Sequence, residues 1–383
     1  MDKKTQELML SLIRAELCTD LSVITDTSPS DETLANIYRY SLAHDLAHMV
    51  GASLEKAGLL SNESLKSVYA AAGQRAIFRY ANQSTVYEEV CALFEKEGIP
   101  YLPLKGSVMR DLYPTPEMRV ACDIDILVPE EKIDTAVALL TESLGFEKHS
   151  KCFHDVSLML GSVHLELHYN IKEDDPRLDP LLARVWSYTT SEQGSYRHKM
   201  TDEFFAFHII AHTCYHFLHG GCGIKSLMDL WLLRHKTDFN HNGVLALCRE
   251  CGIETFYLAI CDLSDVWFSG APHTSLTEAM QKYILVGGAY GTSSNKIIAQ
   301  KNQKGGKLSY LWGRIFMPRY QLERAFPVLK KHPILLPICH VRRWIRVIKR
   351  GRGKQAVGEI AYTVSMPNER DAEIEKMLNN LGF

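Results

Sequence analysis

The segment from Asp123 to Val128, with sequence DIDILV, constrains the fold of this chain most, because it reads as a strand with one acidic face and one apolar face. Side chains alternate along a strand, so Asp123 and Asp125 point one way while Ile124 and Ile126 point the other. Two neighbouring carboxylates repel each other unless a cation lies between them. Mg²⁺ is held by one or two carboxylates together with water and substrate phosphates. The segment therefore predicts a metal-dependent phosphoryl-transfer site.

A glycine turn precedes this strand and carries positive charge. Gly106 allows the backbone to approach a phosphate closely, and Ser107 opens a predicted short helix whose N–H groups attract anions. The guanidinium groups of Arg110 and Arg119 match the geometry of phosphate oxygens. We therefore expect Lys105, Gly106, Ser107, Arg110 and Arg119 to bind the phosphates of a nucleotide. For the two arginines, the alternative is that they neutralise the carboxylates or face solvent.

A third acid lies in the segment VHLELH at 163–168, which also alternates, with His164, Glu166 and His168 on its polar face. If this strand lies beside the first, Glu166 completes a three-carboxylate cluster for two Mg²⁺ ions, with Mn²⁺ as an alternative. Glu166 could also accept the proton of an attacking hydroxyl. We expect Asp123, Asp125 and Glu166 to be the catalytic residues and the metal ligands. The alternative is a strand face whose acids pair with arginines.

The order of the predicted elements favours an α+β fold. Apolar residues recur at helical spacing from about residue 5 to residue 98, and again from 201 to 300. Residues 171–200 are polar and are predicted to be a linker or flap. The elements predicted between them are a helix over 85–97, a strand over 101–104, a helix over 107–112, the acidic strand, a helix over 129–144, and two strands over 152–160 and 162–170.

These motifs resemble the nucleotidyltransferase superfamily that includes DNA polymerase beta and the aminoglycoside nucleotidyltransferases. That superfamily is marked by a Gly-Ser turn, an Asp-x-Asp strand and a later acid on a neighbouring strand. The chain is more similar to the bacterial group called "nucleotidyltransferase family protein", through LKG at 104–106, YP at 113–114, Arg119 and DIDILV at 123–128. The helix near His212 and His216, the segment 225–229 and the Arg-rich C-terminal stretch are similar as well.

The resemblance implies a nucleotidyltransferase-type mixed sheet with helices, flanked by N-terminal and C-terminal helical regions. The resemblance spans most of residues 85 to 350. From the resemblance together with the residue patterns, we expect an N-terminal helical region at 1–84, a nucleotidyltransferase core at 85–190, a helical domain at 191–300 and a basic C-terminal region at 301–383. The resemblance also implies an enzyme that transfers a nucleoside monophosphate from an NTP, expected to be ATP, to an acceptor hydroxyl that the sequence does not identify.

Charge is unevenly distributed along the chain. Residues 301–354 hold fifteen Lys and Arg and a single acid, Glu323, although the net charge of the whole chain is only −2. We expect a segment with this excess of positive charge to contact an anionic partner, which could be substrate phosphates, nucleic acid, an acidic membrane surface or the acidic remainder of the chain. Residues 334–350 mix apolar and basic residues as in an amphipathic helix. We expect this segment to face the cleft or pack on the acidic remainder, with membrane or nucleic-acid binding as the alternative.

Four histidines, at positions 208, 212, 216 and 219, recur at helical spacing. Three interpretations are open for this stripe: a zinc site, side chains that line the nucleotide or acceptor cleft, or packing.

The charges within the first eighteen residues do not suit the apolar core of a signal peptide, and the ten cysteines show no framework spacing. We expect a cytoplasmic protein, with peripheral contact to the inner face of a membrane as an option. A non-catalytic RNA- or membrane-binding adaptor that keeps the fold is the alternative function. An adaptor, however, would not need three acids on one face.

Overall fold

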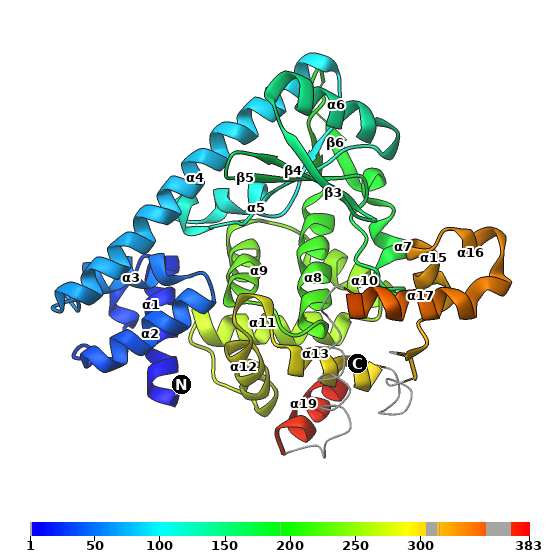
Figure 1. Cartoon of the computed structure of the whole chain (residues 1–383). Coiled ribbons are helices and arrows are strands. Elements are labelled where there is room, and N and C mark those ends of the chain that lie inside the picture. The colour runs from blue at the N-terminus through cyan, green and yellow to red at the C-terminus, as the bar shows by residue number, and fades with distance from the viewer. Residues whose placement is uncertain (1, 192, 304–311, 314, 350–368) are drawn as a thin grey trace.

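A mixed sheet lies above a body of helices in the computed structural model, and the long helix α4 runs along one flank (Figure 1). The structure describes residues 2–191, 193–303, 312–313, 315–349 and 369–383. In spatial order, the five strands are β1 (Leu102–Pro103), β2 (Ile124–Leu127), β5 (Val163–His168), β4 (Asp155–Leu160) and β3 (Glu147–Lys151). The predicted α+β fold is confirmed.

The central pair of strands sets the register of the acidic residues. β2 and β5 are parallel, with Ile124 opposite Leu165 and Asp125 opposite Glu166. β1 and β4 flank this pair in antiparallel orientation. β4 and β5 form the predicted hairpin, and Gly161 in its turn has a φ of 58°, which a glycine adopts without steric cost. The alternation of polar and apolar residues then places all acids of both strands on one face.

The apolar face of the sheet is covered by helices. Ile124, Ile126 and Leu165 are buried there against α4 (Glu63–Glu97) and α6 (Ile133–Leu144), which contribute Phe94 and Leu140. Burial of such side chains stabilises by roughly 2 kcal/mol each. The acidic face of the same strands is therefore turned away from this core.

A second, larger core joins helices from both ends of the chain. Its helices are α1 (Lys3–Cys18), α2 (Asp31–Ala43), α3 (Ala47–Lys56), α8 (Asp202–Leu218), α9 (Ile224–Lys236), α10 (His241–Glu250), α11 (Glu254–Phe268), α12 (Ser275–Gly287), α13 (Ser293–Gln303) and α19 (Glu369–Asn380). α4 runs without interruption past residue 84, where the sequence places the end of the N-terminal region. The division into four regions stays a prediction. Among the described residues, no helix is long and apolar enough to cross a membrane.

Two segments differ from the expectations. Strand β3 was not predicted, because its sequence EKHSK holds no apolar residue; it is an exposed edge strand that forms by pairing with β4. The segment 171–200 is not a simple linker. It contains α7 (Asp179–Leu182), β6 (Thr189–Ser191) and β7 (His198–Met200), and Leu178 and Leu182 are fully buried in the larger core. These few apolar residues anchor an otherwise polar segment.

Three helices in the described part of the basic C-terminal segment pack on one another. α15 (Arg319–Ala325), α16 (Val328–Lys331) and α17 (Leu336–Lys349) enclose a small apolar cluster of Leu322, Phe326, Leu329 and Cys339. These helices project from the body at the right of Figure 1. Lys301, on α13, forms an ion pair with Glu375 on α19, as expected for contact with the acidic remainder. For α15 to α17, the expectation that they face the cleft or the acidic remainder stays a prediction. Residues 304–311, 314 and 350–354 lie outside the described residues.

A buried ion pair fastens the loop before β2 to the helical body. Arg119 lies on that loop and Asp229 on α9, and their side chains are only 11% and 5% exposed. Arg119 Nε and Nη2 donate to the two oxygens of Asp229 at 2.8 Å each, and the Tyr113 hydroxyl donates to Asp229 at 2.6 Å. Lys225, also on α9, donates to the Val120 carbonyl at 2.8 Å. The position of the acidic strand thus depends on α9.

Substitution of Asp229 by Asn should lower the free energy of unfolding by about 3 kcal/mol, because it leaves the buried Arg119 without a counter-charge. Urea denaturation measures this change. The control is Arg249→Gln, which removes a pair whose arginine is 63% exposed and should change the free energy of unfolding far less, because water screens that pair. Equal effects of the two substitutions would contradict the structural role of the Arg119–Asp229 pair.

Candidate active site

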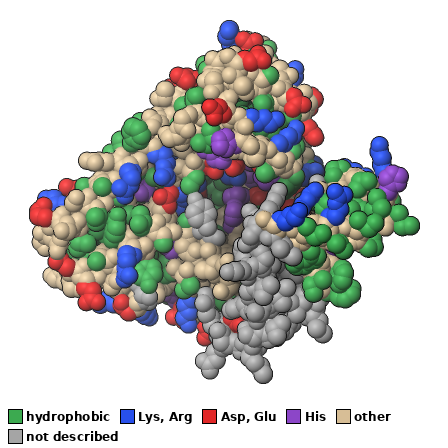
Figure 2. Space-filling model, in the orientation of Figure 1, with side chains coloured by type: hydrophobic (Ala, Val, Ile, Leu, Met, Phe, Trp, Pro, Cys, Tyr) green, Lys and Arg blue, Asp and Glu red, His purple; other side chains and the backbone are tan. Residues whose placement is uncertain are grey.

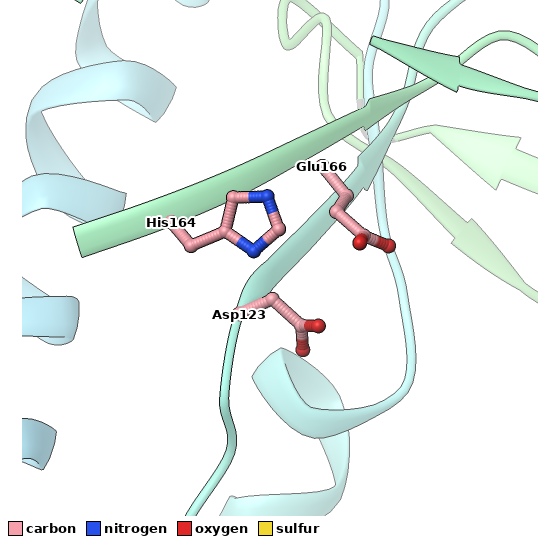
Figure 3. Close-up of side chains that lie close together, drawn as sticks. All are labelled: Asp123, His164 and Glu166. Carbon is pink, nitrogen blue, oxygen red and sulfur yellow. The ribbon is translucent and has the colours of Figure 1, made fainter. Parts of the chain in front are cut away.

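Three carboxylates meet on the polar face of β2 and β5. Asp123 directly precedes β2, Asp125 lies within it, and Glu166 lies opposite Asp125 on β5. Two sets of side chains place their ligand atoms within 4.8 Å of one another: Asp123, His164 and Glu166, and Asp125, Glu166 and His168. Figure 3 shows the first set, with Asp123 and Glu166 directed toward the same space. Glu166 belongs to both sets. The structure therefore brings the three acids predicted from sequence into one cluster.

The protonation of the acids reflects their crowding. Burial, reinforced by the charge of Asp125, raises the pKa of Asp123. Burial and the neighbouring aspartates also raise the pKa of Glu166 to about 7. Asp125 differs: burial alone would raise its pKa, but Lys105 and His168 hold it below its ordinary value. The environment therefore favours the ionised form of Asp125 and disfavours the ionised forms of Asp123 and Glu166.

A layer of basic side chains holds Asp125 in place. His168 Nε2 lies 2.9 Å from Asp125 Oδ1, and Lys105 Nζ lies 3.9 Å from the same oxygen. The ring of His154 stacks on His168 at 5.6 Å, and its Nε2 lies 2.8 Å from Asp155. Because a carboxylate only accepts hydrogen bonds, His168 Nε2 carries the proton in this contact. The two histidines thereby fix the orientation of Asp125.

The acids open into a cleft of about 410 Å³ between the sheet and helices α8 and α9. Figure 2 shows acidic and histidine side chains gathered within this hollow. A volume of this size suits a small-molecule or nucleotide site. A neighbouring hollow of about 690 Å³ lies along α4, is lined by Arg75, Phe78 and Arg79, and shares Cys122 with the cleft. Cys122, which directly precedes Asp123 in the chain, therefore borders both spaces.

Three of the five predicted phosphate-binding residues line the cleft: Lys105, Gly106 and Arg119. Lys105 is held at a φ of 37°, an uncommon and strained conformation for a residue with a side chain. Burial alone would lower the pKa of Lys105, but the carboxylates led by Asp125 raise it, so its ammonium group stays charged. Arg119 contributes to the wall of the cleft while its guanidinium binds Asp229.

Two predicted residues lie elsewhere. Ser107 does not line the cleft among the described residues, and its backbone N–H donates to the Leu104 carbonyl. Arg110 is buried away from the cleft, where it donates to the Gly106 carbonyl and to Gln83 and stacks over Tyr80. Arg110 is thus corrected from a phosphate clamp to a residue that holds the glycine turn against α4. Nothing in the sequence distinguished these arginines, because their partners are distant along the chain.

The histidine stripe faces the cleft in part. His212 and His216 on α8 line it, and their rings meet at 4.4 Å. His208 lies deeper, where burial lowers its pKa to about 3. None of the stripe belongs to either metal-competent set among the described residues, so the zinc interpretation finds no support there. His212 and His216 lie at the cleft, as the cleft-lining interpretation expects, and their role toward a nucleotide or acceptor stays a prediction.

Sequence reasoning missed Glu173, which lies in the segment assigned to a linker. Its carboxylate accepts a hydrogen bond from His212 Nδ1 at 2.7 Å. Burial alone would raise the pKa of Glu173, but His212 and Lys105 hold it well below its ordinary value. With Nδ1 carrying the proton, Nε2 of a neutral His212 is free to accept one. The acidic run at 173–175 was a weak signal, since such runs usually face solvent.

The chemistry of the acid cluster fits a divalent cation. The donors are carboxylate oxygens, which Mg²⁺ and Mn²⁺ prefer, and the raised pKa values of Asp123 and Glu166 show that their charges lack compensation. Lys105 Nζ lies 3.9 Å from Asp125 and lowers the pKa of all three acids, but burial and the neighbouring carboxylates outweigh its effect on Asp123 and Glu166. Asp123, Asp125 and Glu166 are therefore the residues that could hold a metal.

Comparison with known proteins identifies the family of this chain. The family model described as "uncharacterised nucleotidyltransferase" matches residues 30–269, which is more than half of the chain. No curated protein matches the sequence. Among solved structures, that of the antibiotic-resistance factor ANT(2'')-Ia is 14% identical, with 47% of this chain and 96% of that chain covered at a TM-score of 0.34. On the family match, the chain belongs to the uncharacterised nucleotidyltransferases.

Proposed function

We propose that this enzyme transfers a nucleoside monophosphate from an NTP to an acceptor hydroxyl, with Mg²⁺ or Mn²⁺ held by Asp123, Asp125 and Glu166. The observation that carries the proposal is the position of Glu166, whose carboxylate is shared by both metal-competent sets. A shared carboxylate suits a pair of ions, which when bound would neutralise phosphate oxygens and acidify the acceptor hydroxyl. ATP is the NTP that we propose first.

Lys105 and Gly106 form the proposed phosphate contact. Both line the cleft, and the Lys105 ammonium group lies beside the acid cluster. A Cβ built on Gly106 would lie 3.4 Å from the Cβ of Ala121, so a larger side chain at this position would crowd the turn. We propose that the triphosphate lies in the cleft beside Lys105 and Gly106. We also propose that the acceptor enters along the hollow beside α4.

His212 is the proposed proton acceptor for the attacking hydroxyl. Its Nδ1 is held by Glu173, which leaves Nε2 available at the cleft. The hydroxyl proton would pass to Nε2 as the hydroxyl oxygen bonds to the α-phosphorus and the bond to pyrophosphate breaks. In this assignment Glu166 holds metal rather than protons. Glu173 is a positioning residue that fixes the tautomer of His212.

The experiment that tests the function is incubation of the protein with each of the four α-³²P-labelled NTPs, Mg²⁺ and a cell extract, followed by recovery of the labelled product. Label should appear with wild-type protein and disappear with Asp123→Asn and with Asp125→Asn, because each substitution removes a metal ligand. Label that persists with both variants would contradict the assignment of the acids.

The two aspartate variants should differ in stability. Without metal, Asp123→Asn should leave the melting temperature unchanged or higher, because it removes an unfavourable buried charge. Asp125→Asn should lower the free energy of unfolding at pH 8 by about 2 kcal/mol, since Asp125 is a charged hydrogen-bond partner of His168. The repulsion between neighbouring carboxylates that the sequence predicts therefore destabilises the metal-free protein through Asp123 rather than through Asp125. Scanning calorimetry in EDTA distinguishes the two, and the opposite order would contradict the assignment.

Stabilisation by Mg²⁺ should depend on pH through Glu166. The pKa of Glu166 is raised to about 7 in the folded protein, so its contribution to metal-free stability is present below its unfolded pKa and lost as the pH rises through 7. Mg²⁺ must displace this proton at pH 6 but not at pH 8. The Mg²⁺-induced rise in melting temperature should therefore be larger at pH 8. Glu166→Gln should remove this pH dependence, whereas equal wild-type shifts at both pH values would contradict it.

Substitution of His212 by Gln should reduce the rate of transfer to the recovered acceptor by about 10²- to 10⁴-fold, because no base remains for the hydroxyl. The KM for NTP should change little. Glu173→Gln should slow the reaction less, since the imidazole of His212 remains. His216→Gln, which alters the neighbouring ring, is the control and should keep most of the activity. A transfer rate in the His212 variant that equals the rate in the His216 variant would assign the proton to another group.

A further inference from the structure

The outer face of α17 exposes apolar side chains in a single stripe. Ile338, Val341 and Ile345 are spaced three and four residues apart, so they lie on one face of the helix. They are 56%, 60% and 47% exposed, and Ile334, in the turn just before the helix, is 86% exposed. A contiguous apolar stripe of this kind on a protein surface marks an interaction site.

The opposite face of α17 is anchored, so the stripe is held outward. Cys339 is buried with Phe326 and Leu329 in the small cluster between α15, α16 and α17, and Leu336 packs against that cluster. The helix therefore cannot turn its stripe inward without giving up the contacts that hold α15, α16 and α17 together. The stripe needs a partner from outside this lobe.

Basic side chains flank the stripe. Arg342 and Lys349 are exposed and, at three and four residues from Ile345, lie on the same side of the helix. Arg346 lies one heptad from Cys339, toward the anchored face, and its guanidinium rests over the ring of Phe326. Within the described part of 312–349, the ion pair joins Arg319 and Glu323 and involves neither Arg342 nor Lys349. Arg342 and Lys349 therefore add exposed positive charge beside the stripe.

An aliphatic stripe beside basic side chains indicates which kind of partner α17 binds. A nucleic acid offers phosphates but gives aliphatic side chains nothing to stack on, because base stacking requires aromatic or guanidinium planes. A second copy of the chain would bring like charges together around the stripe. A bilayer that contains anionic lipid satisfies both requirements: aliphatic side chains enter the acyl boundary while Arg and Lys remain at the phosphate level.

We infer that α17 docks this protein on membrane surfaces that contain anionic phospholipid. The stripe of Ile338, Val341 and Ile345 lies in the interface, and Arg342 and Lys349 contact lipid phosphates. Binding is peripheral, and both components are needed: the charges for attraction to the surface and the stripe for insertion. This surface is independent of the acid cluster, so it holds whether or not the proposed transfer reaction is correct.

The test is flotation of the full-length protein with phosphatidylcholine vesicles, with or without phosphatidylglycerol. Wild-type protein should float with the anionic vesicles at low salt and much less at high salt. The triple variant Ile338→Gln, Val341→Gln, Ile345→Gln should lower the bound fraction about tenfold. The matched control places Gln at Ile77, Leu258 and Val286, which are 56%, 49% and 56% exposed on other helices, and it should float like wild type.

A second variant, Arg342→Gln with Lys349→Gln, keeps the stripe and should lose the preference for anionic vesicles. Because these two substitutions do not touch the apolar cluster, this variant still tests the inference if the triple variant unfolds. Three outcomes would overturn the inference. Wild-type protein does not float at low salt; the stripe and control variants float equally; or wild type is a dimer by light scattering and the stripe variant a monomer, which would show that a second copy covers the stripe.

Discussion

The repulsion among three carboxylates governs this structure. The parallel register of β2 and β5 sets Asp125 opposite Glu166, and the strand period brings Asp123 to the same face. Such crowding is unfavourable in a protein that binds no cation, and burial increases the penalty. Neighbouring basic groups compensate these charges only in part. Lys105 and His168 compensate Asp125, whereas the pKa values of Asp123 and Glu166 are raised. The surrounding elements hold these charges in place.

Much of this arrangement follows from local pattern. Alternation in DIDILV and VHLELH fixes which side chains share a face, because the strand period is two and a shift by one residue would bury the acids in the apolar core. The helices of the apolar face and the hairpin turn at Gly161 follow from periodicity and turn chemistry. Strand β3 could not be predicted in this way, because it has no apolar face and exists through its pairing with β4.

The remainder depends on contacts between distant parts of the chain. Arg119 has a carboxylate partner because α9 places Asp229 beside it, 110 residues later. Arg110 turns toward Gln83 on α4 instead of the cleft. Glu173 gains its role from His212, 39 residues away, across a segment whose composition suggests a linker. Composition and spacing indicate which groups are charged, but tertiary packing decides which charges remain available for a substrate.

The central claim is that Asp123, Asp125 and Glu166 bind divalent cations together with a nucleotide. The most direct measurement is an anomalous difference map from crystals grown with Mn²⁺ and a non-hydrolysable ATP analogue. We predict Mn²⁺ density in contact with these three carboxylates, with the triphosphate of the analogue beside Lys105 and Gly106. An ordered analogue in the cleft without anomalous density at the three acids, or with Mn²⁺ bound instead at His212 and Glu173, would contradict this account.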